Sequence, residues 1–219
     1  MVVAVIAILA ALLLPALSKA HAAARRINCI SNLKQISAVV LMYANDHNQR
    51  LPKCAGPKGL KGCVVSNTPA SSRDQLFACP ADTFHYDTND AYIPSGQHER
   101  AWSGFSSYSF NGANLVMKSA GVEYPDKLLG VADEPSTSIK EPSRTVLVTE
   151  TAARIGYSWH QPRKVESVNF RFNNARCVAS FVDGHVKYIK FYYDETQAKG
   201  PESWWYDPPD GYEYRWSAR

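Results

Sequence analysis

Hydrophobic positions are concentrated at the start of the chain, where residues 1–17 form an uncharged apolar run interrupted only by Pro15. As a helix rising about 1.5 Å per residue, this run is roughly 25 Å long, near the lower limit for a bilayer core of about 30 Å. The pattern predicts a membrane-spanning helix. Because proline lacks a backbone N–H, we expect a kink at Pro15.

Two alternatives exist for this run. Ala20-His21-Ala22 has the small-x-small form of a signal peptidase site. A secretory signal peptide also needs Lys or Arg before its apolar residues, and here there is none. A buried core helix is permitted by the length and disfavoured by the hydrophobicity on all sides. We therefore favour a membrane anchor that continues into a soluble helix.

The continuation shows helical periodicity, because apolar side chains recur every three or four residues beyond Arg26. These are Ile27, Ile30, Leu33, Ile36, Val40 and Tyr43. Polar residues lie mostly between them, and a polar cluster near Asp46 predicts the end of the helix. We expect a transmembrane half over 1–24 and a soluble amphipathic half over 25–50.

The remaining residues, 51–219, are enough for one globular domain. The stretch 52–94 is rich in Gly, Pro, Ser, Asn and Asp, which predicts irregular loop. Five later segments have strand patterns: 105–110, 145–149, 165–172, 176–182 and 185–192. The predicted fold class is α+β, with an antiparallel sheet packed on the amphipathic half of the N-terminal helix.

Asp183-Gly184 lies between the last two predicted strands. This dipeptide is typical of a β-hairpin with a type I′ turn, in which both central residues have positive φ. A turn is therefore a better interpretation of Asp183 than a catalytic role.

Several blocks resemble the type IV pilin-like proteins, specifically a bacterial branch of type II secretion pseudopilin-like proteins. The run VVAVIAILAALLLPALSKA resembles the family's membrane helix, and NCISNLKQISAVVLMYANDHNQRLP resembles the segment after it. LFACPAD, SYSFNG and TVLVTE resemble later blocks, and ASFVDGHVKY resembles a terminal motif of a His, nine residues, then Asp-Gly. The resemblance implies structural or assembly roles for Pro15 and for Asp183, Gly184 and His185.

The chain departs from that family in two ways. The family opens with a basic leader, a Gly cleaved by prepilin peptidase and a methylated Phe-Thr-Leu-Ile-Glu type start, none of which is present. Aligning Pro15 with the family proline implies that roughly seven residues of the mature N-terminus, and the leader, precede Met1. Asn173 stands where the motif has its His, so no role of that His transfers.

Charges near the span leave its orientation open. Lys19, Arg25 and Arg26 follow the apolar run, and the positive-inside rule alone would keep that side in the cytoplasm. The resemblance implies the opposite: a single-pass inner-membrane protein with the globular domain outward, in the periplasm or at the cell surface when assembled.

Five cysteines in a domain outside the cytoplasm make disulfides plausible. Cys54 and Cys63 close a short Gly-Pro-Lys loop and are the best candidate pair. Pairing of Cys79 with another cysteine is left open, and Cys29 and Cys177 fit buried thiols as well as disulfide partners. Zinc is the alternative, disfavoured because no Cys-x-x-Cys or paired-His spacing occurs.

Catalytic motifs are missing from the sequence, and the six His are dispersed. Asp133-Glu134 and Glu150 are more typical of solvated surface carboxylates than of an acid pair. Asp87, Asn89 and Asp90 resemble a calcium loop without its Gly and closing Glu. We expect no enzyme and no cofactor, with calcium as the alternative.

The C-terminal tail is aromatic and proline-rich, a composition that argues against a regular strand. Its aromatic residues are Trp204, Trp205, Tyr206, Tyr212, Tyr214 and Trp216. We expect them to pack over the sheet edge rather than to form an open patch. The formal charge of +4 comes from dispersed lysines and arginines and does not indicate nucleic-acid binding.

The resulting functional expectation is a non-catalytic subunit of a pilin-like filament or type II secretion pseudopilus. Its partners would be the membrane, copies of itself through the N-terminal helices, and other pilin-like subunits. The alternative is a membrane-tethered extracytoplasmic module that binds a ligand such as a polysaccharide through the aromatic tail.

Overall fold

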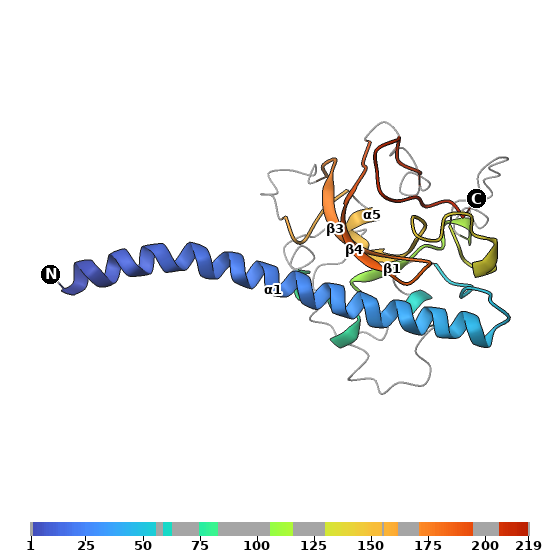
Figure 1. The fold of residues 1–219 in the computed structure, drawn as a ribbon, viewed down its shortest axis with the longest axis horizontal. Coiled ribbons are helices and arrows are strands. Elements are labelled where there is room, and N and C mark those ends of the chain that lie inside the picture. Colours follow the sequence, from blue (N-terminus) through green and yellow to red (C-terminus); the bar gives the residue numbers. More distant parts are fainter. Residues whose placement is uncertain are drawn as a thin grey trace.

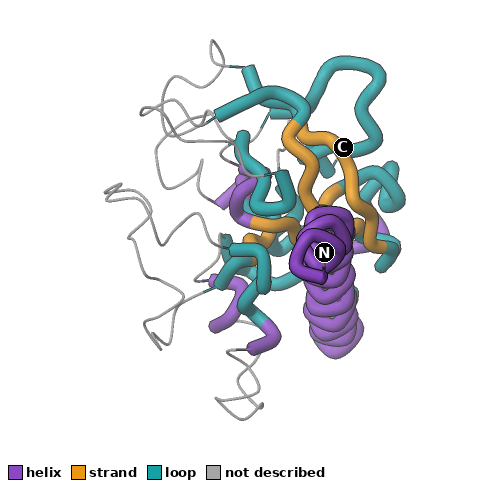
Figure 2. Tube along the Cα trace, turned by 90° about the vertical axis from the view of Figure 1, so that its left-hand side faces the viewer, coloured by secondary structure: helices purple, strands orange, loops and turns teal. Residues whose placement is uncertain are grey.

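A computed structural model describes residues 2–55, 59–62, 75–82, 106–115, 130–154, 156–161, 171–194 and 206–218. Its largest element is helix α1 (Val2–Asp46), which extends well beyond the rest of the molecule at its N-terminal end (Figure 1). The strands lie beside the C-terminal half of this helix (Figure 1), and the view along the helix axis shows them next to the helix (Figure 2).

Four antiparallel strands form one sheet in the order β1-β2-β3-β4. They are β1 (Tyr108–Phe110), β2 (Val146–Glu150), β3 (Ala175–Phe181) and β4 (Val186–Phe191). A short 3-10 helix η2 (Ser136–Ser138) precedes β2, and α5 (Thr151–Arg154) follows it. The predicted α+β fold class is confirmed.

Helix α1 buries a stripe of small and aliphatic side chains against β2, β3 and β4. Cys29 is the first buried residue, and the stripe recurs every three or four residues, as helical geometry requires. Its members are Cys29, Leu33, Ile36, Ser37, Val40 and Ala44. Ile27, predicted on this face, is 61% exposed, because two residues along a helix turn the side chain by about 200° away from Cys29.

The N-terminal half of α1 is apolar and exposed. It is long and apolar enough to cross a membrane, and its most hydrophobic 18-residue window is 0% buried, so the alternative of a buried core helix does not describe this fold. The helix runs through Pro15 without interruption and curves gently (Figure 1). The helix is continuous at Pro15, and the kink expected there stays a prediction.

The β3-β4 hairpin is present where Asp183-Gly184 predicted it, but its turn differs. Gly184 has φ +89°, whereas Asp183 is not among the residues with positive φ. The Gly184 N–H donates to the Phe181 carbonyl at 2.9 Å, and the Phe181 N–H donates to the His185 carbonyl at 3.0 Å. This is a three-residue loop with a left-handed glycine, so the predicted type I′ turn is wrong.

Other strand predictions were partly right. Four of the five predicted segments contain an observed strand within a few residues of the expected bounds. The fifth, 165–172, lies largely outside the described residues, and its last two residues are not in a strand. The predicted loop 52–94 contributes to the core, because Leu60, Phe77 and Cys79 are fully buried.

The described part of the tail packs against the sheet edge, as predicted. Tyr214 and Trp216 are 1% and 3% exposed, and both rings contact Phe191 at the end of β4. The Val146 N–H donates to the Arg215 carbonyl at 2.9 Å, which extends the pairing of β2 without a regular strand. Trp204 and Trp205 lie outside the described residues.

A close backbone contact at Gly112 tests how residues 54–55 pack against the segment that follows β1. A Cβ at this position would lie 2.2 Å from the Cys54 carbonyl oxygen and 2.6 Å from the Ala55 Cα, which is too close for either backbone to remain in place. Gly112→Ala is therefore expected to lower the free energy of unfolding by about 3 kcal/mol. Urea unfolding of the full chain in detergent micelles measures the change.

Gly62→Ala is the matched control, because a Cβ there meets nothing within 4 Å and the residue lies in a helical turn. It is expected to be neutral or slightly stabilising. Equal destabilisation by the two variants would contradict the close contact at Gly112.

Candidate functional site

A disulfide links Cys29 of α1 to Cys79, and the two Cα atoms lie 5.3 Å apart. Of the two alternatives left open for Cys29, the disulfide is the one observed, whereas Cys177 is a buried free thiol. Cys54 is buried, and Cys63 lies outside the described residues, so the predicted Cys54–Cys63 pair stays a prediction.

Polar contacts hold the segment around Cys79 against the helix and β1. The Asn32 side-chain amide donates to the Ala78 carbonyl at 3.2 Å. The Cys79 N–H donates to Ser107 Oγ at 2.9 Å, and that hydroxyl donates to Asp82 Oδ2 at 2.7 Å. Cys79 is thus positioned by local hydrogen bonds as well as by its disulfide.

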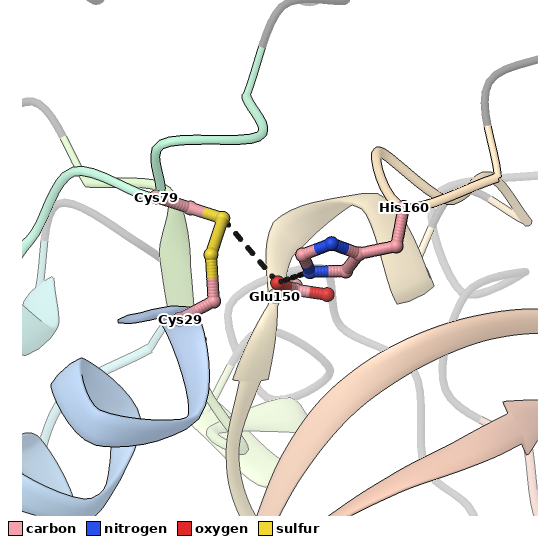
Figure 3. A group of neighbouring side chains, drawn as sticks. All are labelled: Cys29, Cys79, Glu150 and His160. Carbon is pink, nitrogen blue, oxygen red and sulfur yellow. Dashed lines mark hydrogen bonds and ion pairs between the residues drawn. A yellow bond between two sulfur atoms is a disulfide. The ribbon is translucent and has the colours of Figure 1, made fainter. Parts of the chain in front are cut away.

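A buried carboxylate lies against this disulfide. Glu150, the last residue of β2, is 0% exposed, and its Oε1 lies 3.5 Å from Cys79 Sγ (Figure 3). Because a disulfide sulfur carries no hydrogen, this is a contact and not a hydrogen bond. The Val178 N–H of β3 donates to the other oxygen, Oε2, at 2.9 Å.

His160 completes the cluster. Its Nε2 lies 2.8 Å from Glu150 Oε1, and its side chain is only 3% exposed. The backbone N–H of His160 donates to Ser158 Oγ at 3.2 Å, and the imidazole ring meets the Tyr188 ring edge to face at 5.7 Å between centroids. Cys29, Cys79, Glu150 and His160 therefore present one sulfur, nitrogen or oxygen atom each, all within 4.8 Å of one another.

This cluster overturns one expectation from the sequence. Glu150 was expected to be a solvated surface carboxylate, but it lies in the core because β2 ends inside the molecule. His160 follows α5 by only a few residues, and this short connection returns it to the end of β2 (Figure 3). No local spacing signals the group, because its members come from four separate segments.

The buried carboxylate influences the titration of its neighbours. Burial, and secondarily the charge of Glu150, hold the pKa of the Cys177 thiol and of the Tyr108 hydroxyl well above their usual values. Burial raises the pKa of Asp82 from 3.8 to about 7, the Ser107 hydrogen bond opposes this rise, and the charge of Glu150 adds to it.

The site residues predicted from the sequence lie elsewhere. His185 Nδ1 is 2.6 Å from Asp183 Oδ1, and the His185 ring stacks on Phe181 in the exposed β3-β4 turn. Gly184 supplies the left-handed residue of that turn, and Pro15 lies in the exposed half of α1. None of them belongs to the buried cluster.

Remaining candidate positions have structural surroundings or are not described. Asn173 Oδ1 accepts a hydrogen bond from the Tyr193 N–H at 3.0 Å, which ties the start of β3 to the end of β4. Asp133 pairs with Arg50 at 3.0 Å. The calcium candidates at 87–90 lie outside the described residues.

Comparisons of the chain with models of protein families, with curated proteins and with solved structures found no match. The functional argument therefore depends on the geometry described above and on the sequence pattern.

Removing the disulfide tests how strongly it stabilises the domain. The cysteines are separated by 50 residues, and a loop of this size contributes about 4 kcal/mol in the chain-entropy account. The double variant Cys29→Ala, Cys79→Ala is expected to lose a similar amount in urea unfolding. Cys177→Ala is the control, because it truncates a buried thiol without removing a cross-link. A loss no larger than two such truncations would contradict the assigned role.

Asp82 predicts a pH dependence of stability. Because its pKa is higher in the folded chain, the folded state binds more protons than the unfolded state between pH 4 and 7. The contribution of Asp82 to stability therefore falls as pH rises through this window, by about 4 kcal/mol for a shift from 3.8 to about 7, and does not change further above it.

Asp82→Asn, which cannot ionise, is expected to remove this component, so its melting temperature should exceed that of the wild type at pH 8 and match it near pH 4. Thermal unfolding monitored by circular dichroism across this range measures the difference. Parallel pH profiles for the two proteins would show that Asp82 does not titrate in this way.

Proposed function

We propose that this chain is a structural subunit of a pilin-like filament or type II secretion pseudopilus, with no catalytic role. Its long helix would anchor it in the inner membrane as a single span, with the globular domain outward. The observation that carries the proposal is the division of α1 into an exposed apolar half and a half fixed to the sheet.

The exposed half needs an apolar environment. Large aliphatic side chains cover it on all sides, including Ile6 at 60%, Leu9 at 55% and Leu13 at 66% exposure. Lipid supplies that environment before assembly, and a bundle of identical helices supplies it in a filament. Exchange between the two conserves the buried apolar area, so subunits can be added without exposing the helix to water.

The fixed half gives the anchor a defined direction. The buried stripe packs α1 on the sheet, and the Cys29–Cys79 disulfide links α1 covalently to the 75–82 segment, so the helix is attached to the globular domain at both places. The resemblance of the helix and of the terminal Asp183-Gly184 block to pseudopilin-like proteins supports the same assignment. Other pilin-like subunits are the expected partners, and the dispersed charge does not favour nucleic acid.

Photo-cross-linking in cells tests the assembly. A photoreactive amino acid at Leu9, in the exposed apolar half, is expected to give covalent dimers and higher oligomers of the full chain, detected by immunoblot. The same substitution at Lys140, an exposed position of the globular domain, is the matched control for exposure and labelling.

The alternative, a tethered binding module, is favoured by one observation. A hollow of about 350 Å³ lies between the β3-β4 strands and residues 210–213 of the tail. Tyr188 and Tyr212 line it together with charged side chains, a combination suited to a sugar. This form of the alternative uses the described part of the aromatic tail.

The two functions give different results in one pair of assays. Leu9 cross-links with no retention of the chain in polysaccharide affinity gels favour the filament subunit. Monomers at Leu9, with gel retention that Tyr212→Ala abolishes, would replace it with the binding module.

A further inference from the structure

The buried cluster has the composition of a metal site. Two cysteine sulfurs, an imidazole nitrogen and a carboxylate oxygen are the donor types that Zn²⁺ takes in four-coordinate sites. Here they come from four segments of the chain, and all four atoms lie within 4.8 Å of one another. The side chains converge on one point between α1 and the end of β2 (Figure 3).

The distances are close to those of a tetrahedral centre. With Zn–S of about 2.3 Å and Zn–N or Zn–O of about 2.0 Å, ligands lie about 3.5 Å apart for sulfur and oxygen and about 3.3 Å for nitrogen and oxygen. The corresponding separations are 3.5 Å for Cys79 Sγ to Glu150 Oε1 and 2.8 Å for that oxygen to His160 Nε2. The two bonded sulfurs would have to separate, and the other pairs of ligand atoms, which lie within 4.8 Å of one another, would have to adjust to the tetrahedral spacing.

We propose that reduction of the Cys29–Cys79 disulfide converts this cluster into a structural zinc site, with both thiolates, Glu150 Oε1 and His160 Nε2 as ligands. The same four residues then have two alternative states, a disulfide under oxidising conditions and a zinc centre under reducing conditions. The disulfide joins α1 to the Cys79 segment, and the zinc centre would in addition join both of them to Glu150 at the end of β2.

The chemistry of the conversion balances with a dithiol as reductant. One thiolate of the reductant attacks a protein sulfur, the S–S bond breaks, and a mixed disulfide forms; the second thiolate then releases the protein cysteine. The reductant becomes a disulfide, and Cys29 and Cys79 gain two electrons and two protons. Zn²⁺ displaces these two protons to solvent when the thiolates bind it.

The histidine must also present an unprotonated nitrogen. A proton between His160 Nε2 and Glu150 Oε1 moves to Nδ1 through solvent exchange if the ring is neutral, or is lost to solvent if the ring is charged. The other carboxylate oxygen of Glu150, Oε2, accepts a hydrogen bond from the Val178 N–H at 2.9 Å. This bond would hold the carboxylate in place while Oε1 binds the metal.

The charge of the proposed centre is acceptable in this environment. Two thiolates, one carboxylate and Zn²⁺ sum to −1, the same as a Cys₃His zinc site. Arg26 and Arg176 lie over the Tyr188 ring, 4.9 and 5.8 Å from its centroid, and that ring contacts His160. One aromatic ring, that of Tyr188, thus lies between these two guanidinium groups and His160.

Burial assigns the site a structural role. Cys29, Cys79 and Glu150 are 0% exposed, and the His160 side chain is 3% exposed, so no position is open to a substrate or water. Closed four-coordinate zinc sites stabilise folds, whereas catalytic ones keep an open position. Zinc would thus replace the stabilisation that is lost with the disulfide.

Metal binding to the full chain in detergent micelles tests the proposal. The protein is reduced with a phosphine under argon, reduction is confirmed by thiol mass labelling, and Zn²⁺ is titrated against a chromophoric chelator. One Zn²⁺ per reduced chain is expected, with a higher melting temperature, and none per oxidised chain. Co²⁺ in place of Zn²⁺ should show tetrahedral ligand-field bands and thiolate charge-transfer absorption.

Variants distinguish this site from adventitious binding. Cys79→Ala and His160→Ala are expected to weaken zinc binding at least about tenfold, whereas Cys177→Ala retains it. His160→Cys replaces one ligand with another and should retain binding with stronger charge-transfer absorption, which separates ligand loss from misfolding. Near-ultraviolet circular dichroism reports the fold of each variant.

Several results would overturn the proposal. These are a reduced wild-type chain that binds no zinc, including after refolding with zinc present, or equal binding by the wild type, Cys79→Ala and His160→Ala. The outcome is independent of filament assembly, because the Leu9 cross-links report the exposed half of α1 and the zinc titration reports the buried cluster.

Discussion

The attachment of helix α1 to the globular domain from Cys29 onward is the constraint on which the rest of the fold depends. From this residue onward, one face of the helix is buried under β2, β3 and β4, and before it the apolar surface is open. A single helix therefore serves two environments with different requirements. The division fixes where the globular domain begins and leaves the preceding residues available to lipid or to neighbouring helices.

Placing a carboxylate at this junction is energetically demanding. A buried, unpaired carboxylate costs several kcal/mol, so Glu150 requires the Val178 N–H and His160 as partners. The carboxylate also helps to specify which segments meet, because the end of β2, His160 and the Cys79 segment must all be placed correctly to contact it. The raised pKa values of Asp82, Cys177 and Tyr108 reflect the same dry, anionic interior.

Features with a local signature were predictable from the sequence. The end of α1 near Asp46, the strands and the position of the β3-β4 hairpin follow from periodicity and turn residues that lie within a few positions of one another. The turn type was missed because the dipeptide Asp183-Gly184 fits both a two-residue turn and the three-residue loop observed. The buried cluster was missed for a different reason. Cys29 and Cys79 are 50 residues apart, and Glu150 meets them only because the sheet packs on the helix, so no spacing rule within one segment detects the group.

The position of the disulfide also determines how the molecule bears mechanical load. Cys29 is the first buried residue of α1, so tension applied along the exposed helix reaches the domain at a covalent bond before it reaches Leu33, Ile36 and Val40. The force then passes through Cys79 into the globular domain. The contacts of the buried stripe that follow Cys29 along α1 carry less of the shear. Detachment of the helix by pulling thus requires breaking a covalent bond or unfolding the domain from the Cys79 side, rather than peeling the stripe away one contact at a time.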